Sequence, residues 1–272
     1  AKALVAGGGD AVVATAPVYA LNDLDEIERH LRAVAAAVDV PLFAYDIPVR
    51  VRTKLPADLL VRLGTEGVLA GVKDSSGDDV AFRRLVAANA AAGSPLVLFT
   101  GHEVVVDGML LLGADGVVPG LANVDAGGYV RLWDLAQAGK WDDARVEQDR
   151  IAALFEIVFQ ARGRSGDAAG VGAFKVAAQR QGLIATETLA FPVEPLADDV
   201  AALKVRHRPC GPRRCPIRRT QRTDLPPAPG GPCAESLGRR PDRIAVHRRP
   251  AGSARRARPG GWSSEPSMSG GF

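Results

Sequence analysis

Five short apolar runs recur along the first 120 residues, and each follows a segment of helical or turn character. The runs start about 20 to 30 residues apart and are continuously apolar. Both features are typical of parallel strands that are joined by right-handed crossovers, in a sheet that is covered on both faces or closed into a barrel. The chain is therefore restricted to a parallel α/β architecture. The runs are AVVAT (11–15), PLFAY (41–45), VLAGVK (68–73), PLVLFT (95–100) and DGVVPG (115–120).

An open doubly wound sheet and a closed barrel fit this pattern equally well. A dinucleotide-binding sheet would carry G-x-G-x-x-G after its first strand, whereas GGGD (7–10) precedes the first run. We therefore expect no nucleotide cofactor. Amphipathic helices are expected at 23–39, 56–64, 78–93 and 102–113 between the runs, and at 127–139, 141–161 and 169–182 after them.

Residues 205–272 differ in composition from the rest. They hold 15 Arg, no Lys and four acidic residues, a net charge of +11, whereas the whole chain carries +3 and the remainder therefore −8. Rich in Pro and Gly, this segment is predicted to be disordered and to result from a shifted reading frame. A basic arm for nucleic acid is the alternative; it is not favoured, because aromatic residues do not interleave with the arginines.

The overall composition, 47% hydrophobic and 24% charged, indicates a soluble globular protein. No apolar stretch approaches the roughly 18 residues that a membrane span needs, so no membrane partner is expected. All three cysteines (Cys210, Cys215 and Cys233) lie in the basic segment, in a spacing that fits zinc poorly. Cysteine usage is therefore uninformative about compartment, and a cytoplasmic location is the default expectation.

The residues that end the runs carry the candidate chemistry, because parallel strands of barrel enzymes present the active site at their C-terminal ends. Lys73 ends the third run, and a partly desolvated lysine amine is a nucleophile that forms Schiff bases with carbonyls. Tyr45 ends the second run as a possible proton shuttle, and the Arg50 guanidinium suits a substrate carboxylate. Each alone has a plainer explanation as a solvent-reaching side chain. Their coincidence on one face favours a catalytic site.

The motifs around these residues resemble the dihydrodipicolinate synthase / N-acetylneuraminate lyase family of pyruvate-dependent class I aldolases. FAYDIPVR resembles the family's Y-N-x-P-x-R motif, and GVKDSSGD resembles its G-x-K-x-x-S/T-G-D motif. GGGDAVVATAPVY and GADGVVPGLANV resemble the fourth-strand and eighth-strand segments, and FKVAAQRQGLIATETLAFPVEPL resembles the C-terminal helical region. These motifs follow the family's order over about residues 1–200.

The resemblance implies a role for four of the residues. Lys73 would form an imine with a 2-oxo acid, typically pyruvate, and Tyr45 would shuttle the proton. Arg50 would contact a substrate carboxylate, as in the synthase branch. Tyr19 matches a tyrosine that reaches the proton relay of a neighbouring subunit, so a homo-oligomer is implied. No metal and no cofactor are implied.

Three further residues match positions near the substrate. Gly101 and Glu103 match positions that line the pocket near the substrate hydroxyls in lyase relatives. Alternatively, Gly101 makes a tight turn and Glu103 is the acid at a helix N-terminus. Ser75 is a candidate substrate contact within the lysine motif; alternatively, Ser75 and Ser76 cap the helix that begins near Asp78.

The chain departs from the family pattern in two ways. Asp46 stands where relatives commonly have Asn, which is expected to alter the charge beside Tyr45. Relatives also begin with three more strand–helix units, including a loop that binds the pyruvate carboxylate. The predicted fold is therefore a partial (β/α)8 TIM barrel with about five of eight strands (1–124), a C-terminal helical region (125–204) and the disordered tail (205–272).

The function favoured by the sequence is a Schiff-base-forming class I aldolase, lyase or synthase whose partner is pyruvate or a related small 2-oxo acid. Two alternatives stay open. One is a catalytically inactive, truncated relative, because three missing strands would leave two sheet edges and much apolar surface exposed. The other is a deoxy-keto-sugar-acid dehydratase or aldolase of the same family.

Overall fold

The five expected runs form one parallel sheet, in which each strand pairs with the next along the chain. The structure is a computed structural model that describes residues 1–161 and 163–196. The parallel α/β architecture predicted from the sequence is therefore confirmed. The strands are β1 (Val12–Thr15), β2 (Leu42–Asp46), β3 (Gly71–Asp74), β4 (Val97–Thr100) and β5 (Gly116–Val117).

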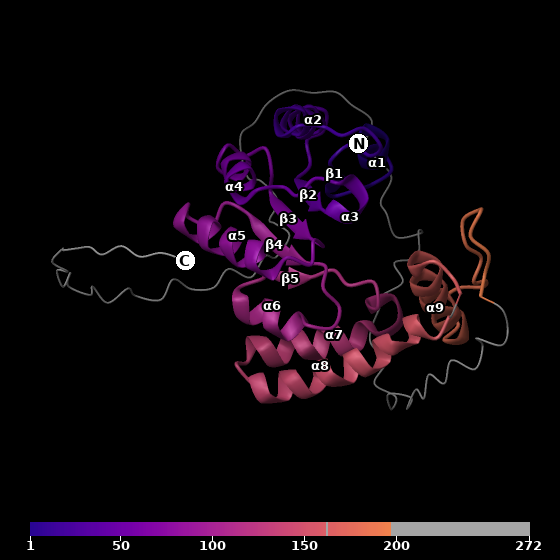
Figure 1. Ribbon diagram of the computed structural model, residues 1–272. Coiled ribbons are helices and arrows are strands. Elements are labelled where there is room, and N and C mark those ends of the chain that lie inside the picture. The colour runs from indigo at the N-terminus through magenta and orange to yellow at the C-terminus, as the bar shows by residue number, and fades with distance from the viewer. Residues whose placement is uncertain (162, 197–272) are drawn as a thin grey trace, which may run out of the picture. The chain divides into compact units, whose positions relative to one another are not determined.

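Helices connect the strands and follow them, close to the positions expected from the sequence (Figure 1). The helix α2 starts at a capping box, in which the Asp23 carboxylate accepts a hydrogen bond from the Glu26 N–H at 2.8 Å. The short α3, directly after β2, was not expected. The helices are α1 (Lys2–Ala6), α2 (Leu24–Ala36), α3 (Pro48–Val51), α4 (Ala57–Thr65), α5 (Asp79–Ala91), α6 (Val106–Leu112), α7 (Ala122–Gln137), α8 (Trp141–Phe155), the 3-10 helix η1 (Glu156–Phe159) and α9 (Gly166–Arg180).

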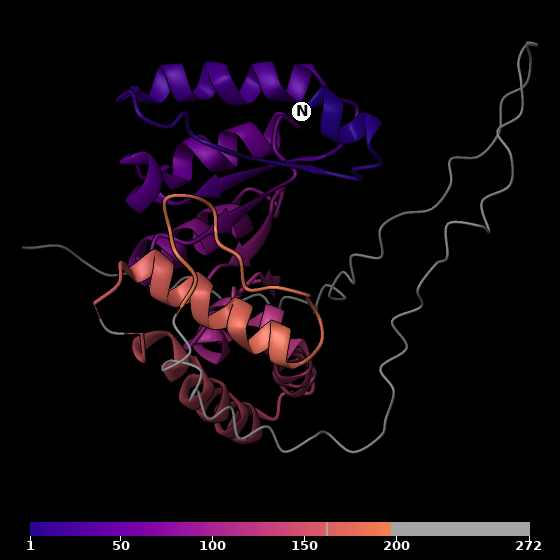
Figure 2. The ribbon, with the colours of Figure 1, turned by 90° about the vertical axis from the view of Figure 1, so that its right-hand side faces the viewer.

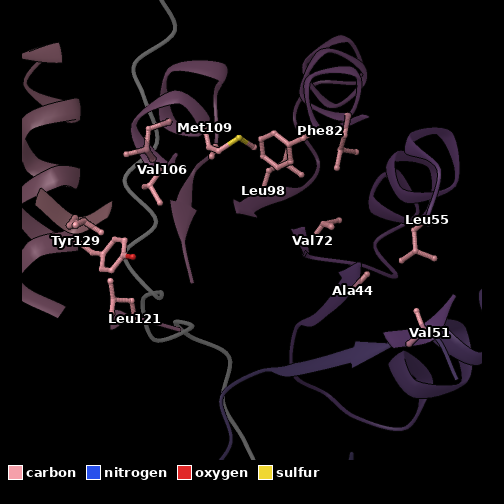
Figure 3. Packing of buried hydrophobic residues seen from close by; sticks show 14 of the residues in the cluster. Ala44, Val51, Leu55, Val72, Phe82, Leu98, Val106, Met109, Leu121 and Tyr129 are labelled. Atoms are coloured by element: carbon pink, nitrogen blue, oxygen red, sulfur yellow. The ribbon is translucent and has the colours of Figure 1, made fainter. Parts of the chain in front are cut away.

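One face of the sheet is buried against helices. Because side chains alternate along a strand, register partners on neighbouring strands point to the same face. Ala44, Val72 and Leu98 share the covered face and are almost completely buried. Phe82 of α5 and Met109 of α6 belong to the same core, as the close view of the packing shows (Figure 3). This core fixes the strands that end at the candidate site.

The other face of the sheet is only partly covered by the described residues. Val13 is 57% exposed on this face, and the rings of Phe43 and Phe99 stack on each other with centroids 5.8 Å apart. Gly71 leaves room for the Phe43 ring, and Gly116 leaves room for the Phe99 ring. Within residues 1–161 and 163–196 the sheet is therefore not covered on both faces, and the exposed apolar surface is what was expected for a partial barrel.

A charged cluster joins α2 to α4 on the surface. Glu28 of α2 accepts hydrogen bonds from Arg62 of α4, at 2.7 Å from two nitrogens, and from Arg32 at 2.7 and 2.9 Å. Arg32 also pairs with Glu66, which follows α4. The two guanidinium groups lower the pKa of Glu28 from 4.5 to about 2, with Arg62 contributing most.

The helices after the sheet pack on one another, with α7 against α8 and α9 against η1 (Figures 1 and 2). A non-helical residue, Asp125, kinks α7 near its start. The predicted domain boundary between residues 124 and 125 falls at this kink, and the division into two domains stays a prediction. Residues 197–204 of the expected helical region and the tail at 205–272 lie outside the described residues.

Candidate active site

Tyr45 and Lys73 are register partners on β2 and β3, so their side chains leave the same face of the sheet. The Lys73 Nζ lies 4.2 Å from the centroid of the Tyr45 ring, a cation–π geometry. Both strands end one residue later, at Asp46 and Asp74. The amine and the phenol, which the sequence singled out separately, therefore meet at the C-terminal edge of the sheet.

Two lysines lie near these strand ends, and their surroundings differ. Lys54 bridges Asp46 and Asp74. Burial lowers the pKa of the Lys54 amine, but its bonds to the two carboxylates outweigh burial and leave that pKa above its ordinary value. Lys73 forms no ion pair within the part of the chain that the structure describes, and Glu103 acts on it only through electrostatic attraction. Of the two amines, only that of Lys54 is therefore bound by carboxylates in the described part of the chain.

Glu103 is fixed by backbone contacts around the loop after β4. Its carboxylate accepts a hydrogen bond from the Leu121 N–H at 2.6 Å and another from the Gly120 N–H. Its carbonyl oxygen accepts from the Tyr129 hydroxyl at 3.0 Å and from the Gln148 amide at 3.2 Å. Burial raises the pKa of Glu103, against the effect of the N–H donors.

These contacts correct one alternative for Glu103. It is not the N-terminal acid of the helix that follows it, since α6 begins only at Val106. Its carboxylate holds the start of α7 instead. No local sequence pattern predicts this contact, because 18 residues separate the acid from its donor.

Gly101 and Ser75 are in direct contact. A Cβ on Gly101 would overlap the Ser75 hydroxyl, so a larger residue at position 101 would force the Ser75 side chain to move. The alternative role of Ser75 and Ser76 as helix caps is wrong, because the Asp78 carboxylate accepts the Ala81 N–H at 2.8 Å and caps α5. Ser75 therefore stays a candidate substrate contact.

Arg50 is paired with an acid that lies 117 residues later in the sequence. Its guanidinium donates two hydrogen bonds to the Asp167 carboxylate at the start of α9, one of them at 2.7 Å. The Asp167 contact raises the pKa of Arg50, and Arg50 lowers the pKa of Asp167. Arg50 also lies within electrostatic reach of Tyr45. The predicted carboxylate contact is therefore near the site, but an internal carboxylate already occupies it.

Tyr19 does not join the other candidates. It lies after β1 with a positive φ of 83° and is 96% exposed. Nothing among residues 1–161 and 163–196 covers its ring to a significant extent. A role for Tyr19 in a neighbouring subunit stays a prediction.

The position of Asp46 changes the interpretation made from the sequence. Its side chain is fully buried on the face opposite Tyr45, bound to Lys54 and, at 3.2 Å, to the Leu55 N–H. The expected charge beside Tyr45 is thus compensated on the far side of the sheet. Lys54 was not predicted from the sequence. The available signal was the pair of acids, Asp46 and Asp74, directly after two apolar runs, since buried acids need a cation.

A cavity of about 440 Å³ adjoins the site. Glu103 lines it on the side of the sheet, while α8, η1 and α9 supply mainly apolar residues, including Phe155 and Phe174. Asp167, the partner of Arg50, and Arg164 supply charge. Lys73 is not among the lining residues, so Glu103 is the link between the cavity and the amine.

No group of three or more His, Cys, Asp or Glu side chains in the described part of the chain is arranged to hold a metal ion. No helix in residues 1–161 and 163–196 is long and apolar enough to cross a membrane.

Sequence comparison identifies relatives for most of the chain. The profile of the Dihydrodipicolinate synthetase family matches residues 1–206. The 4-hydroxy-tetrahydrodipicolinate synthases of Gluconacetobacter diazotrophicus and Phenylobacterium zucineum are 30% and 29% identical to it over 73% and 72% of the chain. The chain spans 63% of the length of each of these relatives.

Solved structures of dihydrodipicolinate synthases and of a sialic acid aldolase share the fold. Dihydrodipicolinate synthase from Bacteroides thetaiotaomicron superposes with a TM-score of 0.67 at 22% identity, over 73% of this chain and 65% of that one. The enzyme from Acinetobacter baumannii, complexed with pyruvate, gives 0.63 at 28% identity, over 74% and 65%. The sialic acid aldolase of Ruminococcus gnavus gives 0.64 at 23%, over 74% and 64%. The expected partial barrel is confirmed.

Proposed function

Because the chain belongs to the dihydrodipicolinate synthetase family, we propose that it carries the Schiff-base chemistry of a class I aldolase or synthase acting on pyruvate or a related 2-oxo acid. The observation that supports this most is the position of the Lys73 amine, 4.2 Å from the Tyr45 ring centroid at the C-terminal edge of a parallel sheet. The pyruvate complex of the Acinetobacter baumannii enzyme is consistent with a 2-oxo acid as the first substrate.

In the first step the neutral Lys73 amine attacks the ketone carbon of the 2-oxo acid. The carbon–nitrogen bond forms as the carbonyl oxygen takes up a proton, and loss of water then gives the imine. Tyr45 is the nearest phenol, and its hydroxyl is the proposed donor and acceptor of the protons that move in these steps. Loss of a proton from the methyl carbon gives the enamine, which attacks an aldehyde in the synthetic direction.

The chain offers a reason why Lys73 rather than Lys54 reacts. A protonated amine has no lone pair for attack, and two carboxylates hold Lys54 in its protonated form. Lys73 forms no ion pair among the described residues, so no carboxylate has to be released before its amine reacts. This difference supports the assignment of the nucleophile independently of the family resemblance.

Two charged side chains, Arg50 and Glu103, favour different classes of second substrate. Arg50 favours an acceptor with a carboxylate, provided that Asp167 releases it. Glu103, which lines the cavity, favours substrates with hydroxyls, as sugar-acid lyases and dehydratases have. An exchange of Asp167 for a substrate carboxylate keeps the charge balance at Arg50, so the carboxylate-bearing acceptor is the proposed class. A homo-oligomer and a cytoplasmic location are further proposals that follow from the family.

Trapping with borohydride in the presence of pyruvate tests the function. The reductant converts an imine into a stable secondary amine, so the mass of the full 272-residue chain should increase by one reduced pyruvate unit per molecule. Lys73→Arg keeps the positive charge and should abolish the adduct, whereas Lys54→Arg should leave it. A folded parent chain that forms no adduct would remove the proposal.

A second candidate is a relative that binds a partner but has no activity of its own. The exposed Val13 on the partly covered face of the sheet favours it. Turnover by a monodisperse preparation of this chain alone would exclude this candidate. Adduct formation without turnover would support it.

A further inference from the structure

The acids that follow Tyr45 and Lys73 are joined by one amine on the opposite face of the sheet. Asp46 and Asp74 are themselves register partners at the ends of β2 and β3. Lys54, from the segment between α3 and α4, binds Asp46 and lies 3.0 Å from the second carboxylate, that of Asp74. We call these three side chains, Asp46, Lys54 and Asp74, the carboxylate bridge.

Every carboxylate oxygen of the carboxylate bridge has a partner. On Asp46, one oxygen binds Lys54 and the other accepts the Leu55 N–H at 3.2 Å. On Asp74, one oxygen binds Lys54 and the other accepts the Ser76 N–H at 2.8 Å and the Ser76 hydroxyl at 2.7 Å. The bridge therefore also orders the turn that follows Lys73.

The burial of the two acids makes the amine necessary. Asp46 is 0% exposed and Asp74 is 5% exposed, and two neighbouring buried carboxylates repel each other strongly. Lys54 is the cation that lies between them. Without it, the ends of β2 and β3 would carry two uncompensated charges one residue beyond the reacting side chains.

We propose that Lys54 is a positioning residue: through Asp46 and Asp74 it sets the separation of the two strand ends and so holds the Lys73 amine over the Tyr45 ring. The catalytic part of this inference rests on the proposed function, whereas the geometric part does not. Lys54 touches neither the amine nor the phenol, and acts only through the residues next to them.

The geometric part is tested by NMR of the full chain labelled at lysine with carbon-13. The chain has six lysines, so the ε-methylene signals are few, and Lys73→Arg identifies the one of interest. The Tyr45 ring current should shift this signal upfield in the parent. Lys54→Met should remove most of the shift, and Lys54→Arg, which keeps the cation, should retain it.

The catalytic part is tested by single-turnover trapping over a range of pyruvate concentrations. Lys54→Met should lower the maximal trapping rate roughly tenfold, because small misplacements of reacting groups are costly, and should leave the half-saturating pyruvate concentration nearly unchanged. Lys54→Arg should recover most of the rate. A role in stability alone would lower the folded fraction, without altering the rate per folded molecule or the ring-current shift.

The inference stays testable if the first variant does not fold. If Lys54→Met does not fold, Lys54→Met combined with Asp46→Asn removes the bridge and one buried charge together, and it should still lose the ring-current shift. An unchanged shift in a folded variant without Lys54 overturns the inference, whatever the trapping shows. A shift that is lost on removal of Lys54, in a chain that never forms an adduct, supports the inference and removes the proposed function instead.

Discussion

Arg50 and Asp167 lie 117 residues apart in the chain, yet the Arg50 guanidinium donates two hydrogen bonds to the Asp167 carboxylate. The pair joins the segment after β2 to the first turn of α9. Both side chains are more than half exposed, so water weakens the pair and a substrate carboxylate is able to replace Asp167. Under the proposed function, Asp167 would therefore compete with the substrate carboxylate for Arg50.

The first prediction follows from this competition. Asp167→Asn should lower the KM for a carboxylate-bearing aldehyde by up to about fivefold, since an exposed ion pair contributes about 0 to 1 kcal/mol. The KM for pyruvate should not change. Steady-state kinetics with each substrate varied in turn checks this, with Arg50→Gln as the variant that should raise the acceptor KM. An Asp167→Asn variant with a higher acceptor KM would contradict the assignment of Arg50.

The second prediction separates the ring of Tyr45 from its hydroxyl. Tyr45→Phe keeps the aromatic face beside Lys73 and removes the proton donor, so imine formation should slow by about 100-fold, near the lower end of general acid–base contributions. Thermal stability should change little. Rapid-quench trapping measures the rate, and an unaltered rate would show that another group or water transfers the proton.

The third prediction concerns the contact between Gly101 and Ser75. Gly101→Ala places a methyl group onto the Ser75 hydroxyl and should destabilise the fold by about 1 to 3 kcal/mol, the usual cost of overpacking. Gly108→Ala is the matched control, because nothing lies within 4 Å of the added atom and the position is inside α6. It should stabilise the chain by up to about 1 kcal/mol. Urea unfolding compares the two, and equal midpoints would contradict the packing.

The fold was largely predictable because it rests on local patterns. Five apolar runs and the helices between them follow from periodicity, and the parallel pairing follows from their spacing. The short helix α3 was missed because four residues do not complete a periodic pattern. Exposed apolar surface was expected for a partial barrel, but the residues that carry it were not predicted, because Val13 and Val12 read alike in sequence although only Val12 faces the core.

The candidate site was predictable only where a residue ends one of the apolar runs of the sequence. Lys73 and Tyr45 were found in this way, and their register brings them together. The partners of the other residues come from distant parts of the chain, as Asp167 does for Arg50. No local pattern encodes such contacts, and Lys54 was overlooked because its two partners are far from each other in sequence.

The fourth prediction concerns Glu28 and the free energy of unfolding at acidic pH. The pKa of Glu28 is lowered from 4.5 to about 2 by Arg62 and Arg32, and the same arginines face Glu66. A lowered folded-state pKa gives stability that is fully present above pH 4.5 and is lost as the pH falls towards 2. The stability difference between the parent and Glu28→Gln should therefore shrink across that window. Chemical unfolding at several pH values measures it, and a constant difference would contradict the pairing.

The position of the reduced adduct shows whether the amine of Lys73 is the nucleophile. Peptide mapping after incubation of the full chain with pyruvate and borohydride assigns the adduct to one of the six lysines. The account predicts a single modified peptide that contains Lys73. Modification of Lys54, or of several lysines to similar extents, would contradict it.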